Sequence, residues 1–251
     1  MLKKSGDIYE LTSWVQFKNL IHGISTAAIG NLKIGLTRGE DVKVNKHKLG
    51  RELGFDANKI IQAQQIHGNK IARVVVEEAG DVMHGVDGLI SNEPGIFLMI
   101  VVADCLPILA YDPETNAFGA AHAGWKGTLV KIAQELVTSL QREFGSKPEN
   151  IKIGLGPCIG HCHSEIGPGL VEKFQSANLN KGVLQTASGK YFLDLRALNI
   201  SQLLDAGIQK QNIDGPIKMC TYESDEFYSY RREALNLTGE FGALIGIKNY
   251  G

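Results

Sequence analysis

Three side chains that bind transition metals, His67, Cys105 and His122, stand where apolar segments end in turns that contain glycine or proline. Polar side chains at the ends of strands converge on one site more readily than the same side chains inside regular elements. Two imidazoles and one thiolate would leave the fourth position of a tetrahedral zinc ion open for water or substrate. The residue types therefore indicate a catalytic zinc site, and copper is possible because the same donors suit it.

The same residues are open to other interpretations. In one alternative, Cys105 is a small buried hydrophobic residue and both histidines are hydrogen-bonded in turns. In another, Cys105 is the nucleophile of a cysteine hydrolase or deamidase, and His122 is its base. Copper-dependent phenol oxidation is a further alternative, but seven scattered histidines do not supply the several copper sites of a multicopper oxidase. The remaining alternative is a protein that binds a metal ion or a partner without catalysing a reaction. Asp87 and Asp104 are candidates to orient ligands or transfer protons, or are ordinary turn carboxylates.

Residues 156–165 contain two cysteines and two histidines within six positions, Cys158, His161, Cys162 and His163. Such a loop could bind a structural zinc ion, but a single chelating loop without a second ligand pair elsewhere is a weak signal. The zinc-deaminase signature is rejected because its His-x-Glu element precedes its cysteines, whereas here it follows them. We therefore predict a glycine-rich loop that approaches a ligand closely. The four cysteines of the chain are too few for a disulfide framework and are predicted to be thiols or metal ligands.

Two basic segments are candidates for binding an anion. Lys126 lies in the glycine-containing segment 122–128, which leads into a predicted helix whose free N–H groups would favour an anion. Arg231 and Arg232 lie beside aromatic residues in 227–233, and arginine binds phosphate or carboxylate at two points. The alternatives are a solvated lysine in a turn, and an edge strand with both arginines in solvent.

The elements that must position these residues follow from apolar spacing and from glycine stops. Helices are predicted over residues 40–53, 128–144 and 195–206, each followed by a glycine. Strands are predicted over 96–102, 151–155 and 241–247, and in two hairpins, 59–67 with 70–76 and 107–111 with 117–121. In an antiparallel hairpin, the numbers of paired residues have a constant sum. If that sum is 227 in the second hairpin, Cys105 lies opposite His122 on one face of the sheet. If it is 228, the two side chains lie on opposite faces. We predict an α+β fold of mixed β-sheets with flanking helices, in a single domain over residues 1–251.

The composition of the chain excludes several classes of protein. Its 251 residues are 43% hydrophobic and 21% charged, which is ordinary for a folded globular protein. The 26 Lys and Arg residues nearly balance the 27 Asp and Glu residues, which argues against nucleic-acid binding. The longest apolar run, 96–103, is far shorter than the roughly 20 residues that span a bilayer, and no signal peptide is indicated. We therefore expect a cytoplasmic enzyme or binding protein without membrane contact, and no pattern predicts its oligomeric state.

Seven short segments together resemble one known family, and they occur in that family's order. The segments are residues 31–32, 65–68, 103–107, 121–127, 156–160, 220–221 and 229–232. The chain resembles the laccase-domain family, formerly called multicopper polyphenol oxidases and now regarded as purine nucleoside phosphorylases. The resemblance runs from about Gly23 to Ile247, and the combined motifs are highly specific.

The resemblance implies both a set of site residues and a reaction. The site residues are His67, Cys105 and His122 as zinc ligands, and Asn31, Lys126 and Arg231 in binding purine nucleoside or phosphate. The implied reaction is phosphorolysis of adenosine, inosine and guanosine to the free base and ribose 1-phosphate, with adenosine deamination and methylthioadenosine phosphorolysis as further activities. The implied fold is similar to the catalytic domain of cytotoxic necrotizing toxins. Val102, Ser164 and Glu240 depart from the usual family pattern, which bears on substrate preference.

Overall fold

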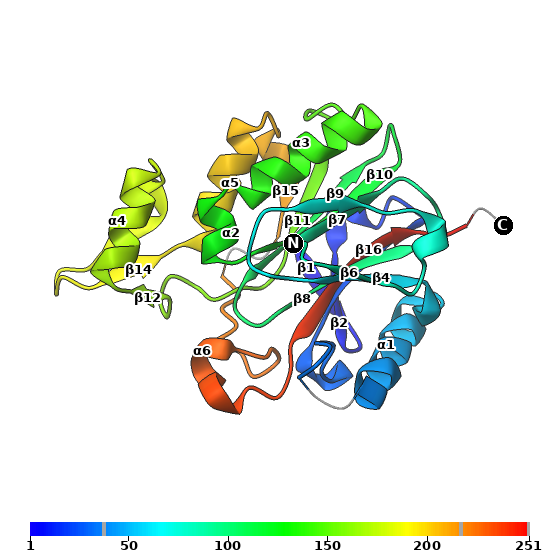
Figure 1. The fold of residues 1–251 in the computed structure, drawn as a ribbon, viewed down its shortest axis with the longest axis horizontal. Helices are drawn as coiled ribbons and strands as arrows, with labels where there is room; N and C mark the ends of the chain where they lie inside the picture. The colour runs from blue at the N-terminus through cyan, green and yellow to red at the C-terminus, as the bar shows by residue number, and fades with distance from the viewer. Residues whose placement is uncertain (37–38, 216–217, 250–251) are drawn as a thin grey trace.

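Three β-sheets form the frame of the computed structural model, which describes residues 1–36, 39–215 and 218–249 (Figure 1). The first sheet contains, in spatial order, β1 (Leu2–Ser5), β2 (Ile8–Leu11), β3 (Leu20–Ser25), β16 (Phe241–Ile247), β8 (Phe97–Val102), β4 (Ile60–Gln64) and β6 (Val82–His84). The second contains β15 (Ile213–Asp214), β11 (Lys152–Leu155), β9 (Leu106–Asp112), β10 (Ala117–Ala123), β7 (Gly88–Ser91) and β5 (Ile71–Arg73). The third, small sheet contains β12 (Glu165–Ile166), β14 (Tyr191–Leu193) and β13 (Val183–Gln185). Both large sheets are mixed, because each combines parallel and antiparallel pairs.

The two large sheets pack face to face, and helices cover their outer faces. The main hydrophobic cluster joins Ile100 and Phe241 of the first sheet to Leu109 and Phe118 of the second. The helices are α1 (Gly39–Leu53), α2 (Trp125–Leu129), α3 (Ile132–Phe144), α4 (Pro168–Ser176), α5 (Leu195–Asp205) and α6 (Tyr230–Glu233). Figure 1 shows α3 and α5 on one side of the sheets and α1 on the other, and separate hydrophobic clusters lie beneath α3 and α1. The predicted α+β fold of mixed sheets with flanking helices is therefore confirmed.

The strongest local signals in the sequence predict their elements correctly. The apolar runs that were predicted as strands form β8 and β16, which adjoin each other and are buried at every position. Strands that are covered on both faces consist of continuous rather than alternating apolar residues. Glycines in the left-handed conformation follow α1, α3 and α5, at Gly54 (φ 70°), Gly145 (φ 69°) and Gly207 (φ 92°). These three helix ends are confirmed because glycine adopts this conformation at little cost.

The helix predicted over 128–144 is confirmed over 132–144 but is interrupted near its start. The chain forms two helices, α2 and α3, which are interrupted at Lys131, a left-handed residue with φ 62°. Side chains from other elements bind the carbonyl groups at the break: the amide of Gln202 donates to the Thr128 carbonyl (2.7 Å) and that of Asn69 to the Val130 carbonyl (2.8 Å). These distant partners replace helical hydrogen bonds, so the apolar spacing alone did not reveal the break.

The first predicted hairpin, around residues 67–69, is also wrong. β4 pairs with β6 and β8 in the first sheet, whereas β5 pairs with β7 in the second. The segment between them crosses from one large sheet to the other. Its backbone is held there by the carboxylate of Asp87, which accepts from the N–H groups of Ile66, His67 and Gly68.

The second predicted hairpin is confirmed, but both predicted registers are wrong. β9 and β10 pair with a sum of 229, as in His122 opposite Pro107. Residues two positions apart in a strand point to the same face, and Cys105 lies two residues before Pro107, the partner of His122. Extending this register therefore puts Cys105 on the same face as His122, as its diagonal neighbour. The predicted shared face is therefore retained although the two residues are not directly opposite.

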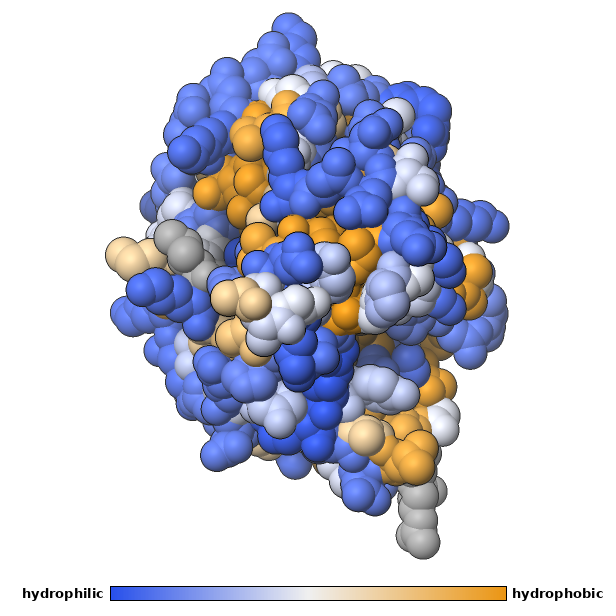
Figure 2. Space-filling view, turned by 90° about the vertical axis from the view of Figure 1, so that its left-hand side faces the viewer, coloured by the Kyte–Doolittle hydropathy of each residue, from blue (hydrophilic) through white to orange (hydrophobic). Residues whose placement is uncertain are grey.

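A small lobe extends from the large sheets, formed by the three-stranded sheet and α4 (Figure 1). Phe174 and Leu193 from this lobe pack with Leu195 and Leu198 of α5 in a separate hydrophobic cluster. Figure 2 shows the molecule from this side, where apolar side chains gather near the centre of the face and hydrophilic ones surround them. No helix in the described part of the chain is long and apolar enough to cross a membrane.

Candidate active site

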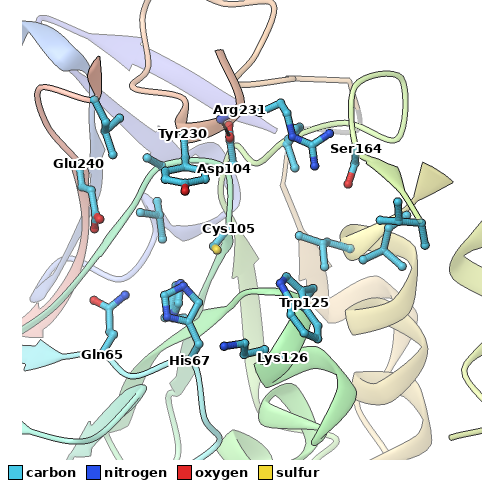
Figure 3. Close-up of a pocket in the computed structure, with 18 of the residues that line it drawn as sticks. Gln65, His67, Asp104, Cys105, Trp125, Lys126, Ser164, Tyr230, Arg231 and Glu240 are labelled. Carbon is cyan, nitrogen blue, oxygen red and sulfur yellow. Dashed lines mark hydrogen bonds between the residues drawn. The ribbon is translucent and has the colours of Figure 1, made fainter. Parts of the chain in front are cut away.

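A pocket of about 690 Å³ lies between the large sheets and the small lobe, and its lining brings together several of the predicted site residues (Figure 3). Its apolar lining consists of Val101, Val102, Ile159, Ile166, Leu170, Leu193, Leu195 and Leu237. In Figure 3, His67 and Lys126 reach into the pocket from one side, and Tyr230 and Arg231 line the other. A mostly apolar cavity with a few convergent polar groups is typical of a small-molecule site.

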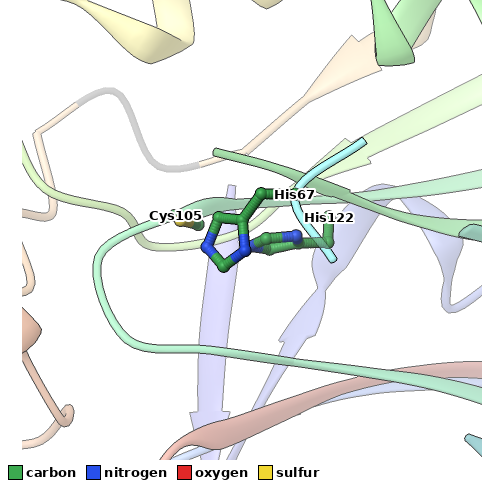
Figure 4. A group of neighbouring side chains, drawn as sticks. All are labelled: His67, Cys105 and His122. Atoms are coloured by element: carbon green, nitrogen blue, oxygen red, sulfur yellow. The ribbon is translucent and has the colours of Figure 1, made fainter. Parts of the chain in front are cut away.

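His67, Cys105 and His122 meet at the floor of this pocket although they come from three separate segments (Figure 4). Their ligand atoms all lie within 4.8 Å of one another. His67 belongs to the segment that crosses between the large sheets, Cys105 to the bend before β9, and His122 to β10. His122 is buried, Cys105 is partly buried and His67 is exposed, so the cluster is closed on one side and accessible from the other.

Gly124 leaves the space that the cluster needs. A Cβ atom at this position would lie 2.9 Å from Cys105 Sγ and 3.2 Å from His67 Cδ2. Any larger residue would therefore push the thiol or the imidazole out of place.

Asp87 orients two of the three donors. Its side chain is fully buried, and its Oδ1 lies 2.9 Å from His122 Nδ1. The same carboxylate accepts from the backbone N–H of His67 at 2.8 Å and holds that residue at a φ of 63°. With Nδ1 of His122 bound to a carboxylate, Nε2 is the ring nitrogen left for a metal ion, which would take the place of any proton there. These contacts support the interpretation of Asp87 as a residue that orients the candidate ligands.

The electrostatics of the cluster favour a thiolate. Burial alone would raise the pKa of Cys105, but the charge of His122 and hydrogen bonds from His122 and His67 lower that pKa to about 7. Burial alone would lower the pKa of His122, but the neighbouring Cys105 thiolate and Asp87 raise it to about 9. Without a bound cation, these shifts favour a thiolate at Cys105 beside a protonated His122, and a metal ion would replace that proton.

Asp104 joins the Cys105 bend to the opposite wall of the pocket. Its carboxylate accepts from the hydroxyl of Thr221 and from the backbone N–H of Arg231, both at 2.6 Å, and its carbonyl accepts from Ile159 N–H at 2.9 Å. It has a positive φ of 85°, which is uncommon for a residue other than glycine. Asp104 therefore positions Cys105 through hydrogen bonds to three separate segments.

The predicted binding residues occupy different environments. Lys126 and Arg231 line the pocket, and Nη1 of Arg231 donates to the His163 carbonyl at 2.9 Å. Asn31 is not among the lining residues; it is 5% exposed, and its Oδ1 accepts from the backbone N–H groups of Lys33 and Glu240. Asn31 therefore positions Lys33 and Glu240, which line the pocket, and its predicted role in binding nucleoside or phosphate stays a prediction.

The arginine pair is split between two roles. Residues 230–233 form the short helix α6, so the edge-strand alternative is wrong. The guanidinium of Arg232 donates to four backbone carbonyls, those of Thr221, Tyr222, Ser224 and Phe227. Arg232 therefore holds the 221–227 loop, and Arg231 is the arginine that faces the pocket.

Some lining residues carry polar or aromatic groups to which the sequence analysis assigned no role. Among them are Lys33, Gln65, Trp125 and Tyr230. The amide of Gln65 binds both backbone groups of Val101, at 2.8 and 2.9 Å, and so ties the end of β4 to β8. Gln65 and Trp125 lie within the quoted motifs, which is the signal that could have identified them, whereas Lys33 lies outside every motif.

The donor set of the cluster fits a metal ion. One thiolate and two imidazoles match the ligands that zinc and copper prefer, and the fully buried Asp87 supplies the carboxylate that commonly orients a metal-binding histidine. The four cysteines are free thiols, as predicted. The structure thus supports a metal site, without distinguishing zinc from copper.

Comparison with known proteins agrees with this arrangement. The family model described as multi-copper polyphenol oxidoreductase laccase matches residues 15–248. The chain is 37% identical over 228 residues to a protein of Deinococcus radiodurans named purine nucleoside phosphorylase, which covers 90% of this chain and 85% of that protein. It is 32% identical over 198 residues to adenosine deaminase RL5 from an unknown prokaryotic organism, with 75% of each chain covered.

A solved structure shares the fold over nearly the whole length. The crystal structure of the Bacillus licheniformis hypothetical protein YfiH superimposes with a TM-score of 0.90 at 27% identity, covering 98% of this chain and 99% of that one. The family match begins after β1 and β2 and includes every residue that lines the pocket. The chain belongs to the multi-copper polyphenol oxidoreductase laccase family.

Proposed function

We propose that the protein is a zinc-dependent purine nucleoside phosphorylase that converts adenosine, inosine and guanosine, with phosphate, to the free base and ribose 1-phosphate. The observation that carries this proposal is a His₂Cys cluster at the floor of a pocket with an apolar wall and cationic side chains. The name of the Deinococcus radiodurans relative supports the same reaction class. The proposed active unit is the whole chain as one laccase-like domain.

Phosphate is the substrate that the cationic side chains would hold. Lys126 and Arg231 both line the pocket, so an anion bound between them would lie close to the ribose of a nucleoside in the same cavity. Binding both reactants in one orientation lowers the entropic barrier to attack on C1′ of the ribose. The positive charge also stabilises phosphate once water is excluded.

The purine is the part of the substrate that the apolar lining would bind. Leu170, Leu193 and Leu195 offer a dry surface for its flat faces, and Tyr230, 61% exposed, offers a ring for stacking. Lys33 and Glu240, an ion pair of 3.3 Å in the lining, are polar groups available to the edge of the base, whereas Gln65 is bound to the backbone of Val101.

His67, Cys105 and His122 would hold the zinc ion in this reaction. Zinc bound there would supply a Lewis acid at an open coordination position. Asp87 holds His122 in the tautomer that leaves Nε2 free, and Asp104 keeps the Cys105 bend against the opposite wall. The same pocket is proposed to deaminate adenosine and to phosphorolyse methylthioadenosine, and the relative named adenosine deaminase supports the deamination.

A nucleoside panel tests the proposal. The purified protein is loaded with zinc and incubated with adenosine, inosine, guanosine and methylthioadenosine, with and without phosphate, and the products are separated by chromatography. We expect base and ribose 1-phosphate only when phosphate is present, and inosine from adenosine in either case. Failure to convert any nucleoside at full zinc occupancy would contradict the proposal.

A cysteine hydrolase or deamidase is the second candidate. The pKa of Cys105, lowered to about 7 beside His122, gives the thiolate and imidazolium that such an enzyme uses. Rapid alkylation of Cys105 in zinc-loaded protein would favour this candidate, because a thiolate bound to zinc is a poor free nucleophile. Protection of Cys105 by zinc would favour the phosphorylase.

Copper is the alternative metal for the cluster in the pocket. Copper-dependent phenol oxidation is the less supported alternative, because the described cluster offers three donors for one ion rather than several copper centres. Oxidation of a phenol by the copper-loaded protein, with no nucleoside turnover, would favour it.

The four free thiols support a reducing compartment such as the cytoplasm.

A further inference from the structure

A second group of sulfur and nitrogen donors lies outside the cluster of the proposed reaction. Cys162 Sγ, His163 and Cys220 Sγ have ligand atoms that all lie within 4.8 Å of one another, and they share no residue with His67, Cys105 and His122. We propose that these three residues, together with the carboxylate of Glu223, form a second metal site that binds zinc as a structural ion. The proposal does not depend on the reaction that the protein catalyses.

The distances agree with tetrahedral coordination. For Zn–S bonds of about 2.3 Å and Zn–N bonds of about 2.0 Å, neighbouring donors lie roughly 3.5–3.8 Å apart. His163 Nδ1 lies 3.2 Å from Cys162 Sγ and 3.9 Å from Cys220 Sγ. Small rotations of exposed side chains would bring both distances to the expected values, because Cys162 is at the surface and His163 is partly exposed.

Glu223 is the proposed fourth donor: it lies outside the group of three, and a rotation of its exposed side chain would bring its carboxylate to the ion. Its Oε1 lies 3.6 Å from His163 Nδ1, which is the separation expected for two ligands of one ion. Structural zinc sites use four protein ligands, and carboxylate oxygen is one of the donors that zinc accepts. A Cys₂HisGlu site would leave no open position, in contrast to the three-donor cluster in the pocket.

The surroundings of the second site are those of a prepared metal site. The backbone N–H of Gly160 donates to Cys220 Sγ at 3.2 Å, and such bonds stabilise a thiolate ligand. Tyr222 stacks on the His163 ring, with centroids 4.1 Å apart and an interplanar angle of 17°, and so fixes its orientation. Burial, Cys220 and Glu223 together raise the pKa of Cys162 to about 11. A cation would relieve this crowding of acidic groups.

The position of the site indicates what the ion would do. It would join the loop that ends at Ser164 to the segment 220–223, which are far apart in the sequence. Ser164 and Glu165 line the pocket, and Arg231 donates to the carbonyls of His163 and Glu165. A metal ion here would therefore fix the wall of the pocket and the position of Arg231, without contacting substrate.

Metal analysis of the full-length protein tests the proposal. Zinc-loaded protein, prepared under reducing conditions and freed of unbound metal, is measured by elemental analysis. We expect two zinc ions per chain in the wild type and one in each of Cys162→Ser, Cys220→Ser and Cys105→Ser. Because Cys162 is exposed, its variant should fold normally, which circular dichroism verifies.

Cobalt distinguishes the two sites directly. In the Cys105→Ser background, thiolate-to-cobalt absorption can arise only from the second site, and it should disappear when Cys162→Ser is added. His163→Ala should weaken cobalt binding at least tenfold, which corresponds to losing one ligand of four. The matched controls are His161→Ala, the adjacent exposed histidine, and Cys158→Ala, the nearby buried thiol, and both should retain two zinc ions.

Two outcomes would overturn the proposal. One is an unchanged zinc content in Cys162→Ser and His163→Ala. The other is a disulfide between Cys162 and Cys220 that persists in the purified protein and leaves no second zinc ion after reduction. The nucleoside assay is separate, so failure of the proposed reaction with two bound zinc ions would leave the second site intact.

Discussion

Asp87 shows how one buried side chain can organise a site made from distant segments. It binds the imidazole of His122 and three consecutive N–H groups at residues 66–68, so it sets both the tautomer of one histidine and the backbone of the other. Burial alone would raise its pKa, but the hydrogen bonds from His122 and these N–H groups lower it. Asp87 therefore remains ionised at neutral pH, although it has no exposed surface.

The three donors of the pocket cluster should each be required for metal binding there. His67→Ala, Cys105→Ala and His122→Ala are each expected to lose one zinc ion relative to the wild type, since a three-donor site cannot spare a ligand. Elemental analysis checks the loss, and circular dichroism should show a retained fold. His84→Ala is the control, because this exposed histidine lies outside the described metal clusters. Unchanged zinc in all three variants would refute the assignment.

Arg231 should contribute to phosphate binding in phosphorolysis and less to deamination, which uses water. A charged hydrogen bond contributes about 1.5–3 kcal/mol, so Arg231→Ala should raise the KM for phosphate roughly tenfold or more. Adenosine deamination, which needs no phosphate, should change less. Arg231→Lys should recover only part of the loss, because lysine retains the charge without the two-point geometry. Steady-state kinetics with varied phosphate checks the effect.

Arg232 offers a contrasting variant for the same measurement. Its guanidinium binds four backbone carbonyls, and Arg232→Ala would leave these groups without their partner. We expect this variant to lose thermal stability and both reactions together. Equal losses of phosphorolysis and deamination in Arg231→Ala, with a normal melting temperature, would contradict its role as a phosphate anchor.

At the scale of elements, β3 carries a buried histidine that makes stability depend on pH. His22 is 4% exposed, and its Nε2 accepts from the Leu11 N–H at 2.9 Å. Burial lowers the pKa of His22 from 6.5 to about 4. Below pH 6.5 the unfolded chain therefore binds a proton that the folded chain does not, so stability falls as the pH falls toward 4. The full effect is about 3 kcal/mol, at about 1.4 kcal/mol per pH unit.

His22→Gln isolates this contribution. Glutamine retains an acceptor for the Leu11 N–H but does not titrate. We expect the free energy of unfolding of the wild type to fall faster than that of the variant between pH 6.5 and 4, with the difference approaching the predicted value. Urea unfolding at pH 7, 6, 5 and 4 measures both proteins. Parallel pH profiles would show that His22 is not responsible.

At the scale of the whole molecule, the hydrophobic clusters between and outside the large sheets should hold the fold without metal. Most of their members are fully buried, and both clusters of metal ligands lie at the edges of these layers. Removing zinc is therefore expected to lower the melting temperature rather than unfold the protein. A ligand at 100 times its Kd stabilises by about 2.7 kcal/mol, which corresponds to roughly 5–10 °C for a chain of this size.

Calorimetry with and without a chelator measures this shift. Readdition of zinc should restore the original melting temperature. Loss of secondary structure on chelation at 25 °C would contradict the expectation, because it would mean that the metal rather than the apolar core holds the sheets together.

Features that depend on neighbouring residues were predictable from the sequence. The continuous apolar runs of β8 and β16 and the glycines that end α1, α3 and α5 were predictable, because burial and backbone conformation at these positions follow from local residue types. The spacing also indicated that His67, Cys105 and His122 could converge, since each lies at or near the end of an apolar segment, and the family resemblance implied that they form one site.

The tertiary structure decided the features that depend on distant partners. The break at Lys131 depends on side-chain amides from Asn69 and Gln202, and the separation of β4 from β5 depends on Asp87. Cys220 joins Cys162 and His163 only because the chain returns to that loop after nearly 60 residues. Local spacing carries no information on such contacts, because a buried polar group binds whichever partner the packing of the sheets brings within reach.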